Sequence, residues 1–376
     1  MIICSKNVLI DKEFRPASIE IKDGKISQIK EYGLGYDFGE FKITPGIVDL
    51  HSDALEKEIE PRPGASFNPK FAIINLDKKI IMSGITTIYH AISFEENSQK
   101  SRNIKNAIEQ VNILHDINKK QLLSDNLIHI RFEICHTDAI EPIKKIIDDK
   151  KASMLSIMDH TPGQGQFKTL ESFMSYYRKH HGMSDEDINF IVEKKQNRDL
   201  GKIYELIKYA TKNGIATLSH DDDGIEKLAV LNALGIEISE FPLSLEVARY
   251  CIKSGLKTGM GAPNIVRGGS QSGNVSAMLL VENEVCSYLC SDYHPSSMLQ
   301  SVYIIAKHTK RPLAQCFELI TKTPAMCAGL NDRGEIKEGL RADLLVIDDK
   351  EIPNVLMSIK DGKMVFSTLN LLGKTA

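Results

Sequence analysis

The sequence predicts a (β/α)8 TIM-type barrel joined to a small β-sandwich domain that both ends of the chain build together. Two observations predict this α/β architecture. Through the middle of the chain, short apolar runs alternate with longer amphipathic stretches rich in Lys and Glu, which is the rhythm of a parallel sheet with connecting helices. Both termini instead carry short stretches of alternating apolar and polar residues, which is typical of β-hairpins.

The small domain is expected to combine residues 1–43 with residues 335–376. Residues 19–29 alternate between apolar and polar side chains on either side of the turn Asp23-Gly24. The C-terminal region repeats this pattern, again with an Asp-Gly turn at residues 361–362. Because the two terminal segments have the same character, they are expected to share one sheet that closes the chain on itself.

The barrel is expected to occupy residues 44–334. Its eight candidate strands end near His51, His90, Glu133, Asp159-His160, His220, Glu240, Gly261 and Asp292. Eight strands that are each followed by a helix make a barrel of the usual size. The alternative is a doubly wound open sheet, but no Gly-x-Gly-x-x-Gly follows the first strand. Residues 167–201, rich in charges, are predicted to be a long excursion between strands four and five.

Composition excludes several classes of function. The 376 residues include 47 Lys and Arg against 50 Asp and Glu, so a net charge of −3 gives no bulk attraction to nucleic acid or to an anionic membrane. No apolar run approaches the ~18 residues that span a bilayer, and the first residues lack a signal-peptide pattern. Seven scattered cysteines without a CxxC indicate reduced thiols. We therefore expect a cytoplasmic protein with neither nucleic-acid nor membrane partners. Association into a homo-oligomer is compatible with this composition.

Polar side chains recur at the expected strand ends, where a barrel carries its active site. His51 and Asp53 are two residues apart and share one face of an extended chain, about 7 Å apart at Cα. The further candidates are Glu133, His160, His220 and Asp292. Gathering three imidazoles and three carboxylates at one mouth costs too much unless cations compensate them. The set therefore predicts two divalent metal ions, Zn²⁺ first with Mn²⁺ or Fe²⁺ as alternatives, because its ligands are nitrogen and oxygen without a thiolate. In the alternative, these are core polar groups with ordinary hydrogen bonds.

The whole chain resembles the amidohydrolase superfamily. The resemblance rests on His51-x-Asp53, the strand-end histidines, Asp292 and the closing segment 334–344. Many members have His-x-His at the first strand and bridge two metals with a carboxylated lysine. No lysine ends a suitable strand here, so the resemblance makes Glu133 the expected bridge.

Longer motifs resemble a narrower family, the diphosphatases of phosphonate utilisation in the carbon–phosphorus lyase pathway. The matching stretches are residues 51–57, 61–64, 158–164, 219–222, 240–242, 261–270, 272–274 and 291–293. The resemblance implies hydrolysis of ribose 1-methylphosphonate 5-triphosphate to the 5-phosphate and pyrophosphate. Two positions depart from the expected pattern: Gln271 replaces a histidine, and Leu243-Ser244 replace a pair of threonines. A relative that acts on another phosphorylated ligand also fits these departures.

The segment after the seventh strand fits a phosphorylated small-molecule substrate through its own residues. Residues 261–274 contain four glycines and an arginine, and barrels commonly bind phosphate in the loops after strands seven and eight. Glycines let backbone N–H groups approach phosphate oxygens, and an arginine can bind one phosphate through two hydrogen bonds. The expected substrate-binding residues are Lys57, Arg62, Asn264, Arg267, Gly268, Gly269 and Ser270. For Lys57 and Arg62, a solvated charged loop is the alternative.

The predicted reaction is metal-dependent hydrolysis of a phosphoanhydride, in which Asp292 transfers the proton of the attacking water. The first alternative is an amidohydrolase that cleaves a C–N bond, such as a deacetylase or a deaminase, and the second is a metal-free scaffold. Activity towards triphosphates or towards acylated amino compounds would separate the hydrolases, and metal analysis would test the scaffold.

The remaining histidines are divided by their position. His115, His129, His180, His181 and His308 lie in amphipathic or polar stretches and are expected to be solvated. His90, His136 and His294 lie near expected strand ends and are weaker candidates for the site.

Overall fold

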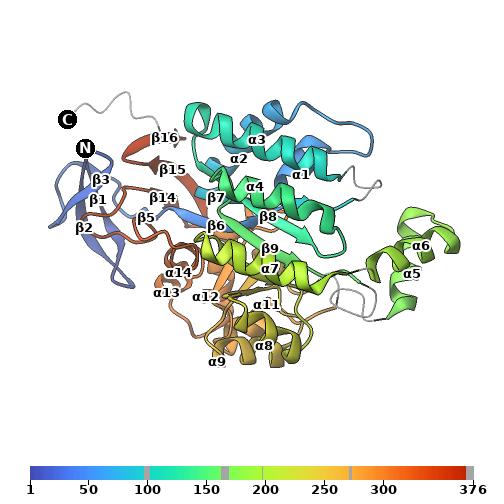
Figure 1. The fold of residues 1–376 in the computed structure, drawn as a ribbon. Helices are drawn as coiled ribbons and strands as arrows, with labels where there is room; N and C mark the ends of the chain where they lie inside the picture. Colours follow the sequence, from blue (N-terminus) through green and yellow to red (C-terminus); the bar gives the residue numbers. More distant parts are fainter. Residues whose placement is uncertain (97–101, 162–168, 197, 271–272, 370–376) are drawn as a thin grey trace.

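The computed structural model describes residues 1–96, 102–161, 169–196, 198–270 and 273–369, and in it eight parallel strands follow one another in chain order around a barrel (Figure 1). The strands are β6 (Ile47–Ser52), β7 (Ile85–Phe94), β8 (Asp125–Glu133), β9 (Met154–Met158), β10 (Ala216–His220), β11 (Ile238–Glu240), β12 (Lys257–Gly261) and β13 (Tyr288–Cys290). The predicted (β/α)8 fold and its eight strands are confirmed.

Backbone hydrogen bonds at the mouth close the barrel between its first and last strands. The N–H of Asp53 donates to the carbonyl of Asp292 at 2.6 Å, and the N–H of Asp292 donates to the carbonyl of His51 at 2.9 Å. Ser52 and Asp292 form a parallel bridge at the same point. Closure therefore places the His-x-Asp motif directly beside residue 292.

Helices cover the outside of the barrel (Figure 1). They are α1 (Ala54–Ile59), α2 (Pro69–Met82), α3 (Ile104–Gln121), α4 (Ile140–Asp148), α7 (Leu200–Lys212), α8 (Ile225–Ala233), α9 (Leu245–Lys253), α10 (Ala262–Arg267), α11 (Ala277–Glu282), α12 (Ser297–His308) and α13 (Leu313–Phe317), with a 3-10 turn at Thr137–Ala139. A further helix, α14 (Lys322–Cys327), packs instead against the core residues inside the barrel. Helix α7 shows the common pattern, because Ile203, Leu206 and Ile207 recur at helical spacing and are buried in the main core.

The predicted excursion between the fourth and fifth strands is helical. Helices α5 (Leu170–His181) and α6 (Asp185–Gln196) project from the barrel (Figure 1) and bury a small core of their own, formed by Phe173, Ile188 and Val192. Where the excursion returns, Nη1 of Arg198 donates to Oδ2 of Asp159 at 2.6 Å, beside the end of β9. The first predicted residues of the excursion, 167–168, lie outside the described residues.

Both ends of the chain share one sheet, as predicted. Its strands run in the order β16-β15-β14-β5-β1-β2-β3, and β4 pairs with β1. They are β1 (Ile2–Ile10), β2 (Glu13–Lys22), β3 (Lys25–Lys30), β4 (Tyr36–Asp37), β5 (Lys42–Pro45), β14 (Leu344–Asp348), β15 (Asn354–Lys360) and β16 (Lys363–Ser367). Asp23-Gly24 and Asp361-Gly362 have positive φ at both residues, as type I′ turns require. Strand β5 crosses the predicted boundary between residues 43 and 44, so that division of the domains stays a prediction.

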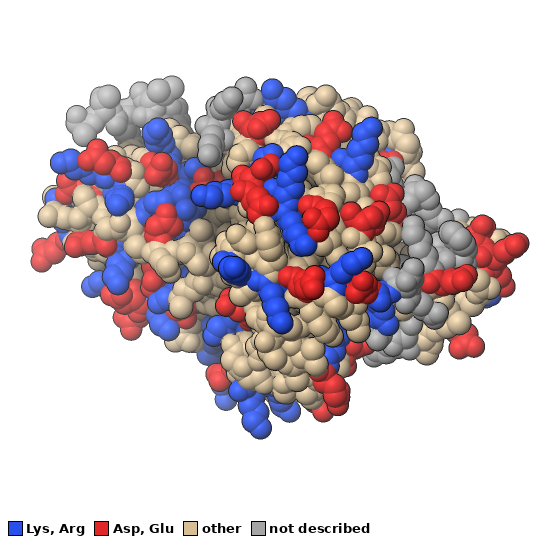
Figure 2. Space-filling model, in the orientation of Figure 1, with Lys and Arg blue, Asp and Glu red and all other residues tan. Residues whose placement is uncertain are grey.

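Surface charge, cysteines and helix hydrophobicity show no sign of a second kind of site in the described residues. On the face shown in Figure 2, basic and acidic side chains are interspersed, and they form no extended surface of one sign. The seven cysteines are free thiols, and burial raises the pKa of Cys286 to about 12, which makes it unreactive. Within the described ranges, no helix is both long and apolar enough to cross a membrane.

Candidate active site

The carboxyl ends of the barrel strands bring the predicted polar residues together at one mouth. Nδ1 of His160 donates to Oε2 of Glu133 at 2.5 Å, and Nε2 of His51 lies 3.5 Å from Oδ1 of Asp53. The ring of His220 lies near both of these histidines, with centroids 5.6 Å from that of His51 and 6.1 Å from that of His160. The residues are therefore close enough to act together, and their role as metal ligands stays a prediction.

Three of the loops at the mouth contain a non-glycine residue in the left-handed region just after a strand. Asp221, Phe241 and Asp292 have φ of 52°, 56° and 53°. Such residues are uncommon outside glycine, and this kind of backbone strain collects at functional sites. The ring of Phe241 lies against His51 and His220, with centroids 5.2 and 5.1 Å apart. Phe241 therefore packs these two histidines, a role that the sequence did not indicate.

Glu240, at the end of β11, is the anion at the centre of the barrel. Nδ1 of His51 donates to its two oxygens at 3.2 Å each, and the hydroxyl of Ser156 donates to Oε2 at 3.1 Å. Burial acts to raise the pKa of Glu240, but His51 and His129 outweigh it and lower this pKa to about 2. Glu240 therefore stays ionised and fixes the orientation of the His51 ring. The sequence marked it as the end of a strand without assigning it to the site.

His129 corrects a prediction, because it is completely buried rather than solvated. It lies on β8 two residues before Arg131 and four before Glu133, so the alternation of a strand turns all three inward. Nδ1 of His129 donates to the carbonyl of Leu50 at 3.0 Å, whereas Nε2 has no hydrogen-bond partner among the described residues. Burial lowers the pKa of His129 to about 4, so the ring is neutral. Period-two spacing from Glu133 was the signal that could have found it.

Two groups of side chains at the mouth are close enough for each to hold a cation. The groups are His51, His129 and Glu240, and His160, His220 and Asp221. In the described part of the chain neither ring nitrogen of the buried His220 has a hydrogen-bond partner. Buried polar atoms without partners cost free energy, and imidazole nitrogen with carboxylate oxygen suits divalent metal ions. The donor set therefore fits the predicted ions, and it adds His129, Glu240 and Asp221 to the predicted residues. The place of Asp221 after a strand-end histidine was visible in the sequence.

The electrostatics of the mouth favour positive charge. Burial lowers the pKa of His51 and of His160, but neighbouring carboxylates outweigh it and raise these pKa values to about 10 and about 9. Metal ions bound to deprotonated imidazoles would supply the same positive charge. This is the physical reason that the carboxylates can be collected here.

Two arginines, Arg131 buried and Arg102 partly buried, balance the acidic side chains near the first strand. Nη1 of Arg131 donates to both oxygens of Asp53, at 2.8 and 3.0 Å. Arg102 pairs with Glu56 at 2.5 Å and with Glu95 at 2.6 Å. Although burial acts to raise the pKa of Asp53, Arg131 holds it well below its usual range. The sequence did not reveal Arg131, because its residue type alone does not distinguish an inward cation from a surface cation.

Asp292 faces the first strand across the closing seam. Burial and the Asp53 carboxylate raise the pKa of Asp292 to about 7, while His51 and Lys57 act in the opposite direction. A carboxyl group with this pKa can accept and release a proton near neutral pH. The role of Asp292 in proton transfer stays a prediction.

Two of the predicted phosphate-binding glycines serve the end of a helix. Gly268 and Gly269 follow α10 with positive φ, and their N–H groups donate to the carbonyls of Ile265 at 3.1 Å and Asn264 at 2.9 Å. In this conformation those N–H groups already have acceptors. A role for them in binding phosphate stays a prediction.

Asn264 and Ser270 organise the same loop. Oδ1 of Asn264 accepts the N–H of Ala277 at 3.0 Å, and the hydroxyl oxygen of Ser270 accepts the N–H of Asn274 at 3.2 Å. These bonds hold the ends of the loop against α10 and α11. Residues 271–272, including the departure at Gln271, lie outside the described residues.

The other departure has a structural explanation at one of its two positions. Ser244 is the N-cap of α9, where its hydroxyl accepts the N–H of Val247 at 3.2 Å. Threonine caps helices in the same way, so this replacement keeps the local structure. Leu243 is buried beside it.

Of the three basic residues predicted to bind substrate, Lys57 and Arg267 lie together and Arg62 lies apart from them. Nζ of Lys57 lies 4.5 Å from the centroid of the Tyr293 ring, and Nη1 of Arg267 donates to the hydroxyl of the same tyrosine at 3.4 Å. Arg62 is exposed in a turn, where its carbonyl accepts the N–H of Ala65 at 3.0 Å. The structure therefore brings Lys57 and Arg267 to one side chain.

The weaker histidine candidates have other surroundings. Strand β7 continues past His90 to Phe94, and Nε2 of His90 donates to Oδ1 of Asn126 at 2.6 Å inside the wall of the barrel. Nε2 of His136 accepts the N–H of Glu96 at 3.2 Å. His294 is exposed. None of these contacts joins the donor groups at the mouth.

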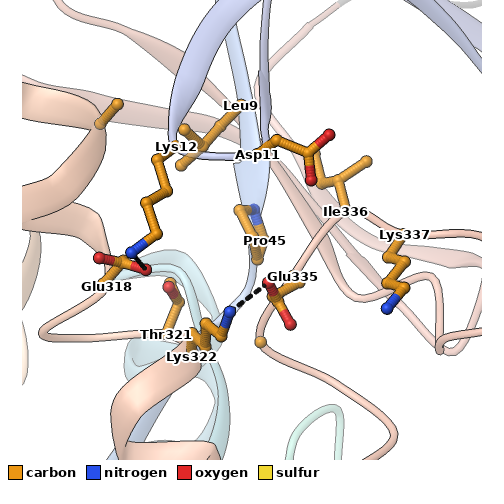
Figure 3. Close-up of a pocket in the computed structure, with 12 residues that line it drawn as sticks. Leu9, Asp11, Lys12, Pro45, Glu318, Thr321, Lys322, Glu335, Ile336 and Lys337 are labelled. Carbon is orange, nitrogen blue, oxygen red and sulfur yellow. Dashed lines mark ion pairs between the residues drawn. The ribbon is translucent and has the colours of Figure 1, made fainter.

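A separate pocket lies between the small sheet and the barrel (Figure 3). Lys12 pairs with Glu318 at 3.2 Å, and Lys322 pairs with Glu335 at 2.8 Å across its lining. Because these charges neutralise one another, the pocket is a junction of the two domains rather than a candidate active site.

The barrel and its donor groups are those of a metal-dependent hydrolase, with the candidate site at the carboxyl ends of the strands. The model of the family described as "Amidohydrolase family" matches residues 84–365. The chain belongs to the amidohydrolase family.

Relatives give the family a narrower context. The alpha-D-ribose 1-methylphosphonate 5-triphosphate diphosphatase of Escherichia coli (strain K12) is 31% identical over 367 residues, which cover 93% of this chain and 96% of that protein. Adenine deaminase 2 of Latilactobacillus sakei subsp. sakei (strain 23K) is 32% identical over 110 residues, 27% of this chain and 19% of that protein. An N-acetyl-D-glucosamine-6-phosphate deacetylase from Mycobacterium smegmatis shares the fold with a TM-score of 0.66, 13% identity and coverage of 98% of this chain and 99% of that one.

Proposed function

We propose that this protein hydrolyses a phosphoanhydride of a phosphorylated sugar and releases pyrophosphate, with ribose 1-methylphosphonate 5-triphosphate as the expected substrate. The observation that carries the proposal is the 31% identity to the E. coli diphosphatase, because it extends over 93% of the chain. The pair of cations beside Asp292 supports it, since a polyanionic substrate needs local positive charge in a protein without a net positive charge. The expected location of the enzyme is the cytoplasm.

Two divalent metal ions, with Zn²⁺ expected before Mn²⁺ or Fe²⁺, would be held at the mouth. The proposed ligands are His51, Asp53, Glu133, His160, His220 and Asp292, with Asp221 as a further carboxylate. When bound, such ions lower the pKa of a water molecule and polarise a phosphoryl oxygen. The ring nitrogens of His220, which have no hydrogen-bond partner among the described residues, support this assignment.

The chain itself supplies orientation and proton transfer. Nδ1–H of His51 donates a hydrogen bond to Glu240, so Nε2 of that ring is left to face Asp53. Arg131 keeps Asp53 ionised and in place. Asp292 would accept the proton of the attacking water and pass it to the leaving pyrophosphate, while the cations beside it bind the phosphate chain.

The test is a substrate screen on protein reconstituted with Zn²⁺ and, separately, with Mn²⁺. Ribosyl and nucleoside triphosphates and acylated amino sugars are each incubated with the protein; ³¹P NMR follows the phosphorus products and ¹H NMR follows the released carboxylic acid. We expect pyrophosphate and a 5-phosphate from a ribosyl triphosphate. Hydrolysis of the acylated compounds alone would contradict the proposal and favour a C–N hydrolase.

A further inference from the structure

We propose that Tyr293 is a positioning residue that holds Lys57 and Arg267 as a pair and thereby selects substrates whose negative charge extends over more than one phosphate. The inference rests on the proposed function, because it names a specificity determinant of the same site. Its evidence is the geometry of three neighbouring loops.

The three side chains come from three consecutive positions around the barrel. Lys57 lies on α1 after β6, Tyr293 follows β13, and Arg267 is the last residue of α10 after β12. Strand β13 pairs with β12 on one side and meets β6 at the closing seam on the other. Tyr293 is therefore the middle of the three, and it directly follows Asp292.

Tyr293 contacts each cation with a different part of its side chain. The ring lies 4.5 Å from Nζ of Lys57, while the hydroxyl oxygen accepts a hydrogen bond from Nη1 of Arg267 at 3.4 Å. The ring face and the phenolic oxygen both attract positive charge, so one neutral side chain holds two cations that would otherwise repel each other. Lys57 and Arg267 remain exposed, whereas the tyrosine is half-buried.

The choice of tyrosine has a consequence for specificity. An Asp or Glu between the cations would neutralise them and would compete with an anionic substrate for the same donors. Tyrosine holds the cations without cancelling their charge. A single phosphate can satisfy one of the two cations, whereas a pyrophosphate chain can meet both. The pair therefore discriminates by the number of linked phosphates.

Two variants separate the contacts of Tyr293. Tyr293→Phe keeps the ring for Lys57 and removes the acceptor for Arg267, and Tyr293→Leu removes both contacts. Tyr209 on α7 is a matched control, because Lys144 lies 5.8 Å from its ring centroid and its hydroxyl donates to Asp148 on the outer surface. Tyr209→Phe and Tyr209→Leu therefore remove a hydroxyl hydrogen bond and a ring–lysine contact away from the mouth.

The measurements are KM and kcat for a ribosyl triphosphate, inhibition by inorganic pyrophosphate and by orthophosphate, metal content and thermal unfolding. We expect Tyr293→Leu to raise KM and the inhibition constant of pyrophosphate about ten- to fiftyfold, and Tyr293→Phe about two- to fivefold. The inhibition constant of orthophosphate should change less than about threefold, and kcat, metal content and the control variants should stay near wild type.

Two results would overturn the inference. One is an unchanged KM and pyrophosphate inhibition in Tyr293→Leu, and the other is an equal loss for orthophosphate and pyrophosphate. If Tyr293→Leu does not fold, Tyr293→Phe decides: adding it to Arg267→Ala should cause no further loss, and a further loss would count against the pairing. If the wild-type protein hydrolyses no triphosphate, the proposed function fails, and calorimetry with pyrophosphate on the metal-loaded protein still tests the pair separately.

Discussion

Strand β8 has a carboxylate at each end, Asp125 and Glu133, and the two carboxylates have different neighbours. At its start, Asp125 is surrounded by cations: Arg333 at 2.6 Å, Arg341 at 2.7 Å and Lys360 at 2.9 Å. Those cations come from the segment that leaves the barrel and from the small sheet. The charge of Asp125 is therefore compensated by the protein itself, and the compensation fastens one domain to the other.

At the other end of the same strand, Glu133 lies at a mouth that collects several carboxylates and imidazoles. His160 contacts Glu133 at 2.5 Å, yet the nearby ring of His220 has no hydrogen-bond partner among the described residues. A cluster that is complete stabilises the fold, while a cluster that still attracts cations is prepared to bind them. The comparison teaches that a buried polar cluster is prepared to bind cations where some of its donor atoms lack partners among the described residues.

The largest expected effect comes from Glu133→Ala. Removing this carboxylate should lower the bound metal and abolish turnover together, because it removes a predicted bridge between the ions. Metal analysis and the pyrophosphate assay measure both quantities. Asp125→Ala at the opposite end of β8 is the control, and it should keep its metal. Full metal occupancy with a normal rate in Glu133→Ala would remove Glu133 from the site.

Asp292→Asn should keep metal and substrate bound but reduce kcat by roughly two to four orders of magnitude, the usual effect of losing a general acid-base group. The amide is nearly the same size as the carboxyl group but cannot take up the proton. Steady-state kinetics over a range of pH provide the measurement. A kcat that barely changes at every pH would exclude Asp292 from proton transfer.

Arg267→Ala should lower kcat/KM for a triphosphate roughly ten- to several-hundredfold, because hydrogen bonds to charged groups contribute about 1.5–3 kcal/mol. Arg267→Lys keeps the charge without the fork of donors and should lie between Ala and wild type. Competitive inhibition by pyrophosphate should weaken in parallel. Unchanged triphosphate kinetics, together with no pyrophosphate inhibition of the wild type, would favour C–N bond hydrolysis.

Glu240→Gln tests the carboxylate that accepts a hydrogen bond from His51 inside the barrel. It should weaken metal binding roughly ten- to a hundredfold, as the loss of a carboxylate behind a metal-ligating histidine does, because His51 is no longer held in one orientation. Competition with a chelator measures the affinity directly. Asp222→Asn, which changes another buried carboxylate, is the control. Equal metal affinity in Glu240→Gln and wild type would leave Glu240 with a role in the barrel core alone.

Asp125→Asn should have the smallest effect on catalysis and act on stability instead. Burial acts to raise the pKa of Asp125, but Lys360 and Arg341 hold it below its usual range. Its stabilising contribution is therefore present above the unfolded pKa of about 4 and is lost as pH falls below it. The free energy of unfolding of the variant should be about 1–3 kcal/mol lower near pH 7. Its melting temperature should depend less on pH in the acid range than that of the wild type. An unchanged melting temperature at pH 7 would contradict this.

The sequence by itself determined the barrel, its eight strands and the mouth. Apolar periodicity is local, so it marked each strand, and the fold class then required all strand ends to meet at one edge. This is why His51, Glu133, His160 and His220 could be placed together without a structure. The Asp-Gly turns of the small sheet were readable for the same reason, because their backbone conformation depends on the two residues themselves.

Only the tertiary structure decided which partners these residues meet. His51 and Glu240 are 189 positions apart, and the contact between them depends on how the strands are staggered around the barrel. The inward direction of His129 and Arg131 likewise needed the register of β8, which turns alternate residues to opposite sides. The meeting of Lys57 and Arg267 at Tyr293 required the closure of the barrel between its first and last strands. Residue type and spacing determine the chemistry of which each side chain is capable. Closure of the barrel determines which charged neighbours that side chain contacts.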